Sequence, residues 1–123
     1  MMKTLSAMSE PRVKTEFWIK AQLRLCDQAL LPVVIAHRGD RDAGQVLIKL
    51  LRQGRGCELV ARRFTADGTR AWMVVAGGAG DGAEQACDGY IARELDIDAD
   101  LWVIEIEDPA GLYMPDGLEP LRD

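Results

Sequence analysis

The middle of the chain, residues 45–76, reads as three β-strands joined by two tight turns, and it limits the possible folds more than any other stretch. The strands are predicted over residues 45–52, 57–64 and 70–76. Between the last two lies Asp67-Gly68. Asp-Gly is the strongest short hairpin signal, because a type I′ turn needs positive φ at both central positions. The other turn contains Gly54 and Gly56, which adopt such angles freely. The stretch therefore predicts a three-stranded antiparallel meander.

Two helices and two further strands are predicted around this meander. The helices are expected over residues 15–31 and 83–95, and the strands over residues 32–38 and 101–107. In the first helix, the apolar residues that recur at four-residue spacing are Phe17, Ala21, Leu25 and Ala29. This periodicity predicts that they form the buried stripe of the helix. Pro32 then ends the helix, because proline lacks the backbone N–H that a further turn would need.

The resulting order of elements is α-β-β-β-β-α-β. It predicts an α+β fold, with a mixed, mainly antiparallel sheet of five strands and two helices. We expect a two-layer sandwich in which both helices cover one face of that sheet. A chain of 123 residues suits a single domain. The domain is expected over residues 10–108, between a flexible N-terminal tail (residues 1–9) and a flexible C-terminal tail (residues 109–123).

The net charge and the cysteines limit the classes of protein to which the chain could belong. The net charge is −5, which argues against a nucleic-acid partner, because such proteins need a basic face to displace counterions. No apolar run approaches the roughly 20 residues that cross a bilayer, and residues 1–8 lack the apolar core of a signal peptide. The cysteines are Cys26, Cys57 and Cys87. Without a Cys-x-x-Cys pair, they are expected to be reduced, mostly buried thiols. These features predict a cytoplasmic protein that has no membrane partner.

A loop of alternating charges, residues 38–44, is a candidate place for chemistry, because loops held by a rigid sheet often carry binding and catalysis. On the sheet itself, Arg63 is expected to form an ion pair with Glu105 of the last strand. The candidate polar surface site consists of His37, Arg38, Asp40, Asp42, Arg63 and Glu105. The alternative function attached to this loop is a weak metal- or nucleotide-linked hydrolase.

Three patterns of known cofactor sites are each incomplete. Residues 78–83 fit a relaxed dinucleotide fingerprint, but Asp81 and Glu84 would place negative charge where a phosphate binds. Acidic residues over 96–107 have the spacing of a calcium loop, but Leu101 replaces its required glycine. The acid-x-Lys motif of metal-dependent nucleases is missing from the predicted meander. We therefore predict no catalytic residue, no bound metal and no cofactor.

Three stretches, taken in order, are typical of a known family. They are Glu16-Phe17-Trp18 in the first helix, Arg38-Gly39-Asp40 with Asp42-Ala43-Gly44 in the loop, and the run DLWVIEIED at residues 100–108. Together they make the chain resemble the bacterial family called domain of unknown function 1491, over about residues 11–108. This resemblance implies a small bacterial cytoplasmic protein and brings no established activity with it.

From the residues we expect a non-enzymatic protein that works through contacts with other proteins. If both helices cover one face of the sheet, the other face exposes Trp72, Val74 and parts of the last strand. Large exposed apolar patches mark interfaces. The expected partners are a second copy of the chain, bound through this sheet face, or an unknown protein. A third hypothesis, an antitoxin-like or nucleic-acid accessory protein, is disfavoured by the charge.

Overall fold

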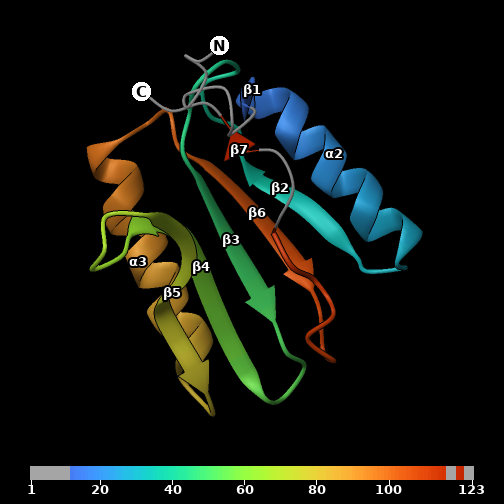
Figure 1. Ribbon diagram of the computed structural model, residues 1–123. Coiled ribbons are helices and arrows are strands. Elements are labelled where there is room, and N and C mark those ends of the chain that lie inside the picture. The colour runs from blue at the N-terminus through green and yellow to red at the C-terminus, as the bar shows by residue number, and fades with distance from the viewer. Residues whose placement is uncertain (1–11, 116–118, 121–123) are drawn as a thin grey trace.

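The computed structural model describes residues 12–115 and 119–120, and its centre is a five-stranded sheet. The strands are β2 (Val33–His37), β3 (Val46–Leu51), β4 (Gly56–Phe64), β5 (Arg70–Ala79) and β6 (Trp102–Glu107), in the spatial order β2-β6-β3-β4-β5. The helices are α2 (Thr15–Gln28) and α3 (Ala83–Ile97). Apart from this sheet, β1 (Arg12–Val13) pairs in parallel with β7 (Glu119–Pro120) (Figure 1).

The predicted α+β class, the mixed sheet of five strands and the order of the main elements are confirmed. The meander is formed by β3, β4 and β5, which pair antiparallel. Its second turn closes where the Thr65 N–H donates to the carbonyl of Thr69 at 2.7 Å. Gly68 has a φ of 87°, but Asp67 has no positive φ, so the turn is not the predicted type I′. The pair β3–β6 is parallel, whereas β2–β6 is antiparallel. Strand β5 continues to Ala79, three residues beyond the predicted strand over residues 70–76.

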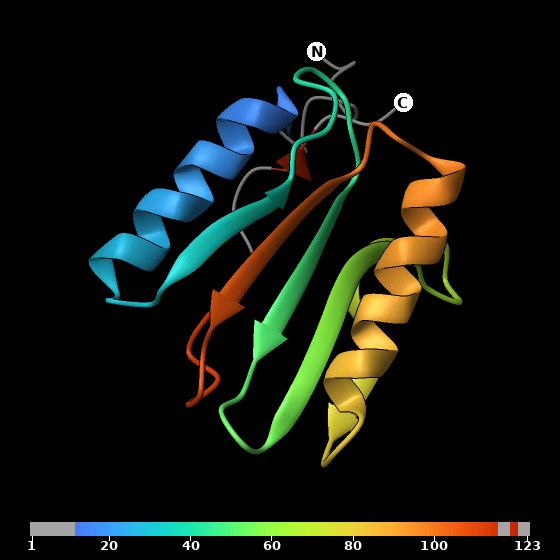
Figure 2. The ribbon, with the colours of Figure 1, turned by 180° about the vertical axis from the view of Figure 1, so that it is seen from behind.

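The two helices lie on opposite faces of the sheet, so the prediction that they share one face is wrong. Side chains alternate along a strand, and Ile48 of β3 packs in the core with α2, whereas its neighbour Leu47 packs in the core with α3. Helix α3 lies behind β4 and β5 in Figure 1 and in front of them in Figure 2. On the α3 side, β3 and β6 carry the apolar residues Leu47, Leu51 and Val103, so these inner strands need cover on both faces.

Helix α2 buries a different stripe from the predicted one. Its buried residues are Thr15, Trp18, Ile19, Gln22 and Cys26. The side chain of Phe17 is 62% exposed, that of Leu25 is 48% exposed, and Ala21 is exposed as well. The prediction that these three face the core is therefore wrong. The helix has two apolar stripes, and the packing of Trp18 against the sheet decides which one faces inward.

The chain that follows β6 folds back over the α2 side of the core. Asp108 is fully buried, and its carboxylate accepts hydrogen bonds from the backbone N–H groups of Leu112 and Tyr113 at 2.8 and 2.9 Å. The buried Tyr113 hydroxyl donates to the side-chain oxygen of Gln22 at 2.7 Å. A single buried tyrosine leaves no periodic pattern, so the sequence predicts a tail from residue 109 instead.

Other parts of the predicted tails lie outside the described residues, namely residues 1–9, 116–118 and 121–123. None of the helices in the described part of the chain has the length and apolar character that crossing a bilayer requires.

Candidate functional site

The predicted loop at residues 38–44 lies against the first turn of α2. The N–H of Thr15 donates to the carbonyl of Asp42 at 3.0 Å, and the N–H of Glu16 donates to the carbonyl of Arg41 at 2.9 Å. The Thr15 hydroxyl donates to the carbonyl of Gly44 at 2.9 Å. A helix leaves its first N–H groups without partners inside the helix, so the loop backbone satisfies two of them and fixes where α2 begins.

The polar side chains of this loop also stabilise its conformation. The Asp40 carboxylate accepts hydrogen bonds from the N–H groups of Asp42 and Ala43 at 3.1 and 2.9 Å. The Nε1–H of Trp102 donates to the Asp40 carbonyl at 2.6 Å, and the Arg38 guanidinium lies 5.9 Å from the centre of the Trp102 ring. These contacts join the loop to the start of β6.

His37 is held in one orientation by the same region. Its Nδ1 lies 2.7 Å from the carbonyl oxygen of Leu101. A carbonyl only accepts hydrogen bonds, so Nδ1 carries the proton of the neutral ring and Nε2 has the free lone pair.

Within the described ranges, no group of three or more histidine, cysteine or acidic side chains is placed to hold a metal ion.

Gly39 allows the loop to approach the start of β6. A Cβ atom on Gly39 would lie 2.0 Å from the carbonyl oxygen of Asp100. We expect Gly39→Ala to lower the free energy of unfolding by about 1–3 kcal/mol, because the backbone must move apart. The matched control is Gly89→Ala in α3, where only the Arg93 guanidinium lies near, at 3.4 Å. That change should raise stability by up to about 1 kcal/mol through helix propensity. Urea unfolding measures both, and equal signs would contradict the proposed close contact.

Lys49, and not Arg63, is the ion-pair partner of Glu105, so the predicted pairing is wrong. The Lys49 ammonium lies 3.4 Å from Glu105, 2.9 Å from Glu84 and 2.7 Å from Asp88, although the residue is only 5% exposed. Burial by itself would lower the pKa of Lys49, but the three carboxylates hold this pKa above its ordinary value. Arg63 instead donates to the Tyr90 hydroxyl at 2.7 Å. The sequence signal for this cluster is a lysine inside an otherwise apolar strand.

The structure divides the predicted polar site into separate places. His37 and Glu105 line a hollow of about 290 Å³ between α3 and the sheet, together with Lys49. Asp40 and Asp42 line a different hollow, of about 570 Å³, at the N-terminal end of α2. Neither hollow is lined by Arg63 or Arg38.

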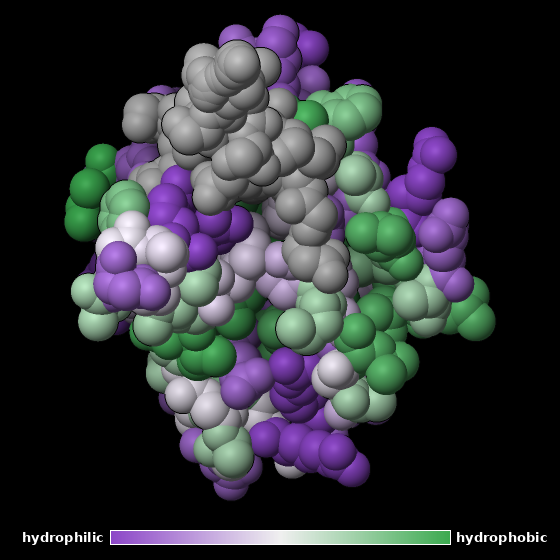
Figure 3. Space-filling model, viewed as in Figure 1, coloured by the Kyte–Doolittle hydropathy of each residue, from purple (hydrophilic) through white to green (hydrophobic). Residues whose placement is uncertain are grey.

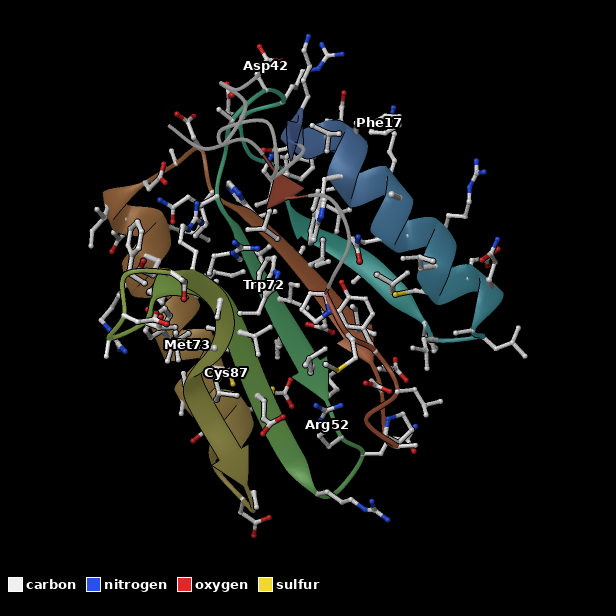
Figure 4. The ribbon with its side chains drawn as sticks, in the orientation of Figure 1. Phe17, Asp42, Arg52, Trp72, Met73 and Cys87 are labelled. Atoms are coloured by element: carbon white, nitrogen blue, oxygen red, sulfur yellow. The ribbon has the colours of Figure 1, made fainter. Side chains whose placement is uncertain are left out.

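The cysteines have the environment of structural thiols. All three are free and buried. Burial raises the pKa of Cys26 to about 11 and the pKa of Cys57 to about 12. Cys87 lies in the core where α3 meets the sheet, and burial raises its pKa as well (Figure 4). A thiol is a poor nucleophile when it is protonated at neutral pH.

The outward side of α2 is the surface that sequence reasoning missed. We define the α2 outer face by Phe17, Lys20, Ala21, Arg24 and Leu25, which line a shallow hollow of about 540 Å³. Figure 4 shows Phe17 on the side of α2 turned away from the sheet, and in Figure 3 hydrophobic and hydrophilic residues alternate along this side of the molecule. Of the described residues that line the hollow, two are cationic and none carries a carboxylate. The repeating stripe of Phe17, Ala21 and Leu25 is the sequence signal for this face, but its helical spacing equally predicts a stripe that faces the core.

Comparison with known proteins agrees with the fold. The model of a family described as "Protein of unknown function (DUF1491)" matches residues 13–114. The crystal structure of a DUF1491 family protein from Caulobacter crescentus CB15 is 30% identical, with a TM-score of 0.73, over 88% of this chain and 98% of that chain. An NMR structure of a DUF1491 family protein from the same organism gives 30% identity and a TM-score of 0.69, over 88% and 96%.

The solution structure of protein Atu0922 from A. tumefaciens is 25% identical, with a TM-score of 0.66, over 89% of this chain and 98% of that chain. No curated protein matches the chain.

Proposed function

The chain belongs to the DUF1491 family of proteins of unknown function, and we propose a role for it from its own surface. In this proposal it is a non-enzymatic module that binds another protein through the α2 outer face. The observation that carries this proposal is the second apolar stripe of α2. Phe17, Ala21 and Leu25 are exposed, although they recur at the spacing of a buried stripe. A single exposed apolar residue needs no explanation, whereas a contiguous set marks a contact surface.

The sheet face that the sequence suggested as an interface is largely occupied. Strand β6 lies inside the sheet, between β2 and β3, and Trp102, Ile104 and Ile106 are buried, so the prediction that this strand supplies exposed area is wrong. The ring of Trp72 stacks on Trp18 with their centres 5.5 Å apart. The α2 outer face therefore has the stronger support as the contact surface.

A homo-oligomeric contact near β5 is the second candidate. It is supported by Phe64 and Val74, which are 67% and 52% exposed on or beside this edge strand. The hydrolase alternative has less support, because the backbone and the Asp40 carboxylate of the loop at residues 38–44 serve to hold α2. We also infer a bacterial cytoplasmic location, which the buried free thiols and the Caulobacter crescentus relative support.

The proposal predicts a position-specific covalent adduct in the cells from which the protein comes. A photo-crosslinking amino acid at Ala21 should capture one protein partner, because this position is the centre of the α2 outer face. The same residue at Gln85, which is exposed on α3, is the matched control and should capture none. Gel mobility and mass spectrometry measure the adducts.

The double variant Phe17→Ser with Leu25→Ser should abolish the adduct at position 21. Because both side chains are exposed, it should change the free energy of unfolding by no more than about 0.5 kcal/mol per site. Absence of an adduct at position 21, or equal adducts at both positions, would overturn the proposal. An adduct of twice the mass of the chain would identify a second copy as the partner.

A further inference from the structure

We infer that the partner of the α2 outer face presents an acidic amphipathic helix. The inference rests on the proposed function and adds the chemistry of the partner. The argument has two independent parts, the charge that surrounds the apolar stripe and the shape of the stripe itself.

The two charged residues of the α2 outer face are both cationic, although Lys20 also lines the neighbouring hollow in which Glu16, Asp40 and Asp42 lie. At the N-terminal end of α2, Glu16 pairs with Arg41 at 3.3 Å and Lys14 pairs with Asp42 at 3.7 Å, so these charges offset one another. Lys20 and Arg24 line the hollow, and neither has an ion-pair partner among the described residues. Two cations beside an exposed apolar stripe are complementary to carboxylates on a partner, and such complementarity selects partners by charge.

The shape of the stripe fits a helix. Phe17, Ala21 and Leu25 follow one another at four-residue spacing, which forms a ridge about 12 Å long at 1.5 Å per residue. The small Ala21 at its centre leaves a notch between two large side chains, and helices pack by placing the ridge of one into the groove of the other. Lys20 and Arg24 are also one turn apart. A partner helix with carboxylates one turn apart, flanking its own apolar stripe, would therefore meet both.

Two other occupants fit less well. A two-fold antiparallel contact between two copies, centred on Ala21, would bring Lys20 of both copies side by side, where their charges repel. An anionic membrane is a continuous negative surface and would meet Glu16 and Asp27 of the same helix together with the two cations, whereas a partner helix can place its carboxylates beside Lys20 and Arg24 alone. These occupants are outcomes of the experiment below.

The test uses synthetic helical peptides of about 18 residues and the full chain. The acidic peptide has leucines at helical spacing flanked by glutamates one turn apart, and its two controls carry glutamine or lysine in place of each glutamate. Fluorescence anisotropy at 50 mM salt measures binding. We expect the acidic peptide to bind about tenfold more tightly than the glutamine peptide, since two exposed charge pairs each contribute modestly. The preference should shrink at high salt.

Two variants make the result specific to this face. The double variant Lys20→Glu with Arg24→Glu should reverse the order, so that the lysine peptide binds best, and Phe17→Ser should weaken binding of every peptide. Equal binding of the acidic and glutamine peptides would overturn the inference. So would binding only to vesicles of anionic lipid, or dimerisation that Phe17→Ser abolishes.

The failure of the inference can be separated from failure of the proposed function. If the adduct at position 21 forms but the acidic peptide shows no preference, the inference falls and the α2 outer face remains a binding surface. If the adduct does not form, both fall.

Discussion

Replacing Trp18 by alanine is expected to lower the free energy of unfolding by about 3–5 kcal/mol, the range for removing a large aromatic side chain from a core. Trp18 is 2% exposed and belongs to the core cluster on the α2 side of the sheet. Its ring stacks on Trp72 at an angle of 16° between the ring planes. The change removes this stack and leaves a cavity between α2 and the sheet. Urea denaturation followed by far-UV circular dichroism measures the loss.

Phe17→Ala is the matched control for this prediction. It alters the neighbouring residue of the same helix, but the Phe17 side chain points to solvent, so the expected change stays within about 0.5 kcal/mol. The contrast between two adjacent aromatic residues tests which stripe of α2 is buried. A large loss for Phe17→Ala, or a negligible one for Trp18→Ala, would show that the helix is rotated from the orientation described above.

The second large effect is expected at Asp108. Arg52 donates to the Asp108 carboxylate at 2.9 Å, and two backbone N–H groups donate to it as well. Asp108→Ala leaves these donors without their acceptor in a buried place, so we expect a loss of about 3 kcal/mol in the free energy of unfolding. The loss should also release Tyr113 from Gln22, which the near-UV circular dichroism of the tyrosine would report. Asp27→Ala on the exposed end of α2 is the control.

Asp108 should also shape the response of the protein to acid. Burial alone would raise the pKa of Asp108, but the N–H groups of Tyr113 and Leu112 and the Arg52 guanidinium outweigh it and hold this pKa below its ordinary value. A carboxyl whose pKa is lower in the folded state stabilises the fold at pH values above the unfolded pKa, about 3.9 for aspartate. That contribution is lost as the pH falls through the lower, folded pKa. Asp108→Asn should therefore flatten the decline in stability below about pH 4, and an unchanged decline would argue against this role.

The sequence predicts where the helices and strands lie along the chain, but it does not predict which side of each helix packs against the sheet. Period-two and period-four patterns, together with Asp67-Gly68 and Pro32, predict every main strand and helix to within three residues at each end. The same patterns cannot say which of two apolar stripes on α2 is buried, because both have helical spacing. That choice depends on the distant partners Trp72 and Tyr113, which are brought to the helix only by the fold.

The candidate site shows the same division. The loop at residues 38–44 is recognisable from its glycines and charges, but its role in holding α2 depends on backbone hydrogen bonds, which leave no trace in side-chain composition. Lys49 was missed because a lysine in an apolar strand gives no hint of its partners. Two of these partners, Glu84 and Asp88, belong to α3, which follows the meander in the sequence and is therefore far from Lys49 along the chain.

The position of β6 between β2 and β3 has a consequence for how the molecule assembles. Strands β2 and β3 are neighbours in sequence, yet among the described strands β2 is bonded to β6 alone. The seam of the sheet is therefore closed by the last main strand to leave the ribosome. Until Trp102–Glu107 is synthesised, no strand connects β2 to the meander in the sheet. Strand β2 and strand β3 then each have an unpaired edge. Contacts between residues so distant in sequence slow folding, so the nascent chain is most exposed to misassembly until residues 102–107 have been synthesised.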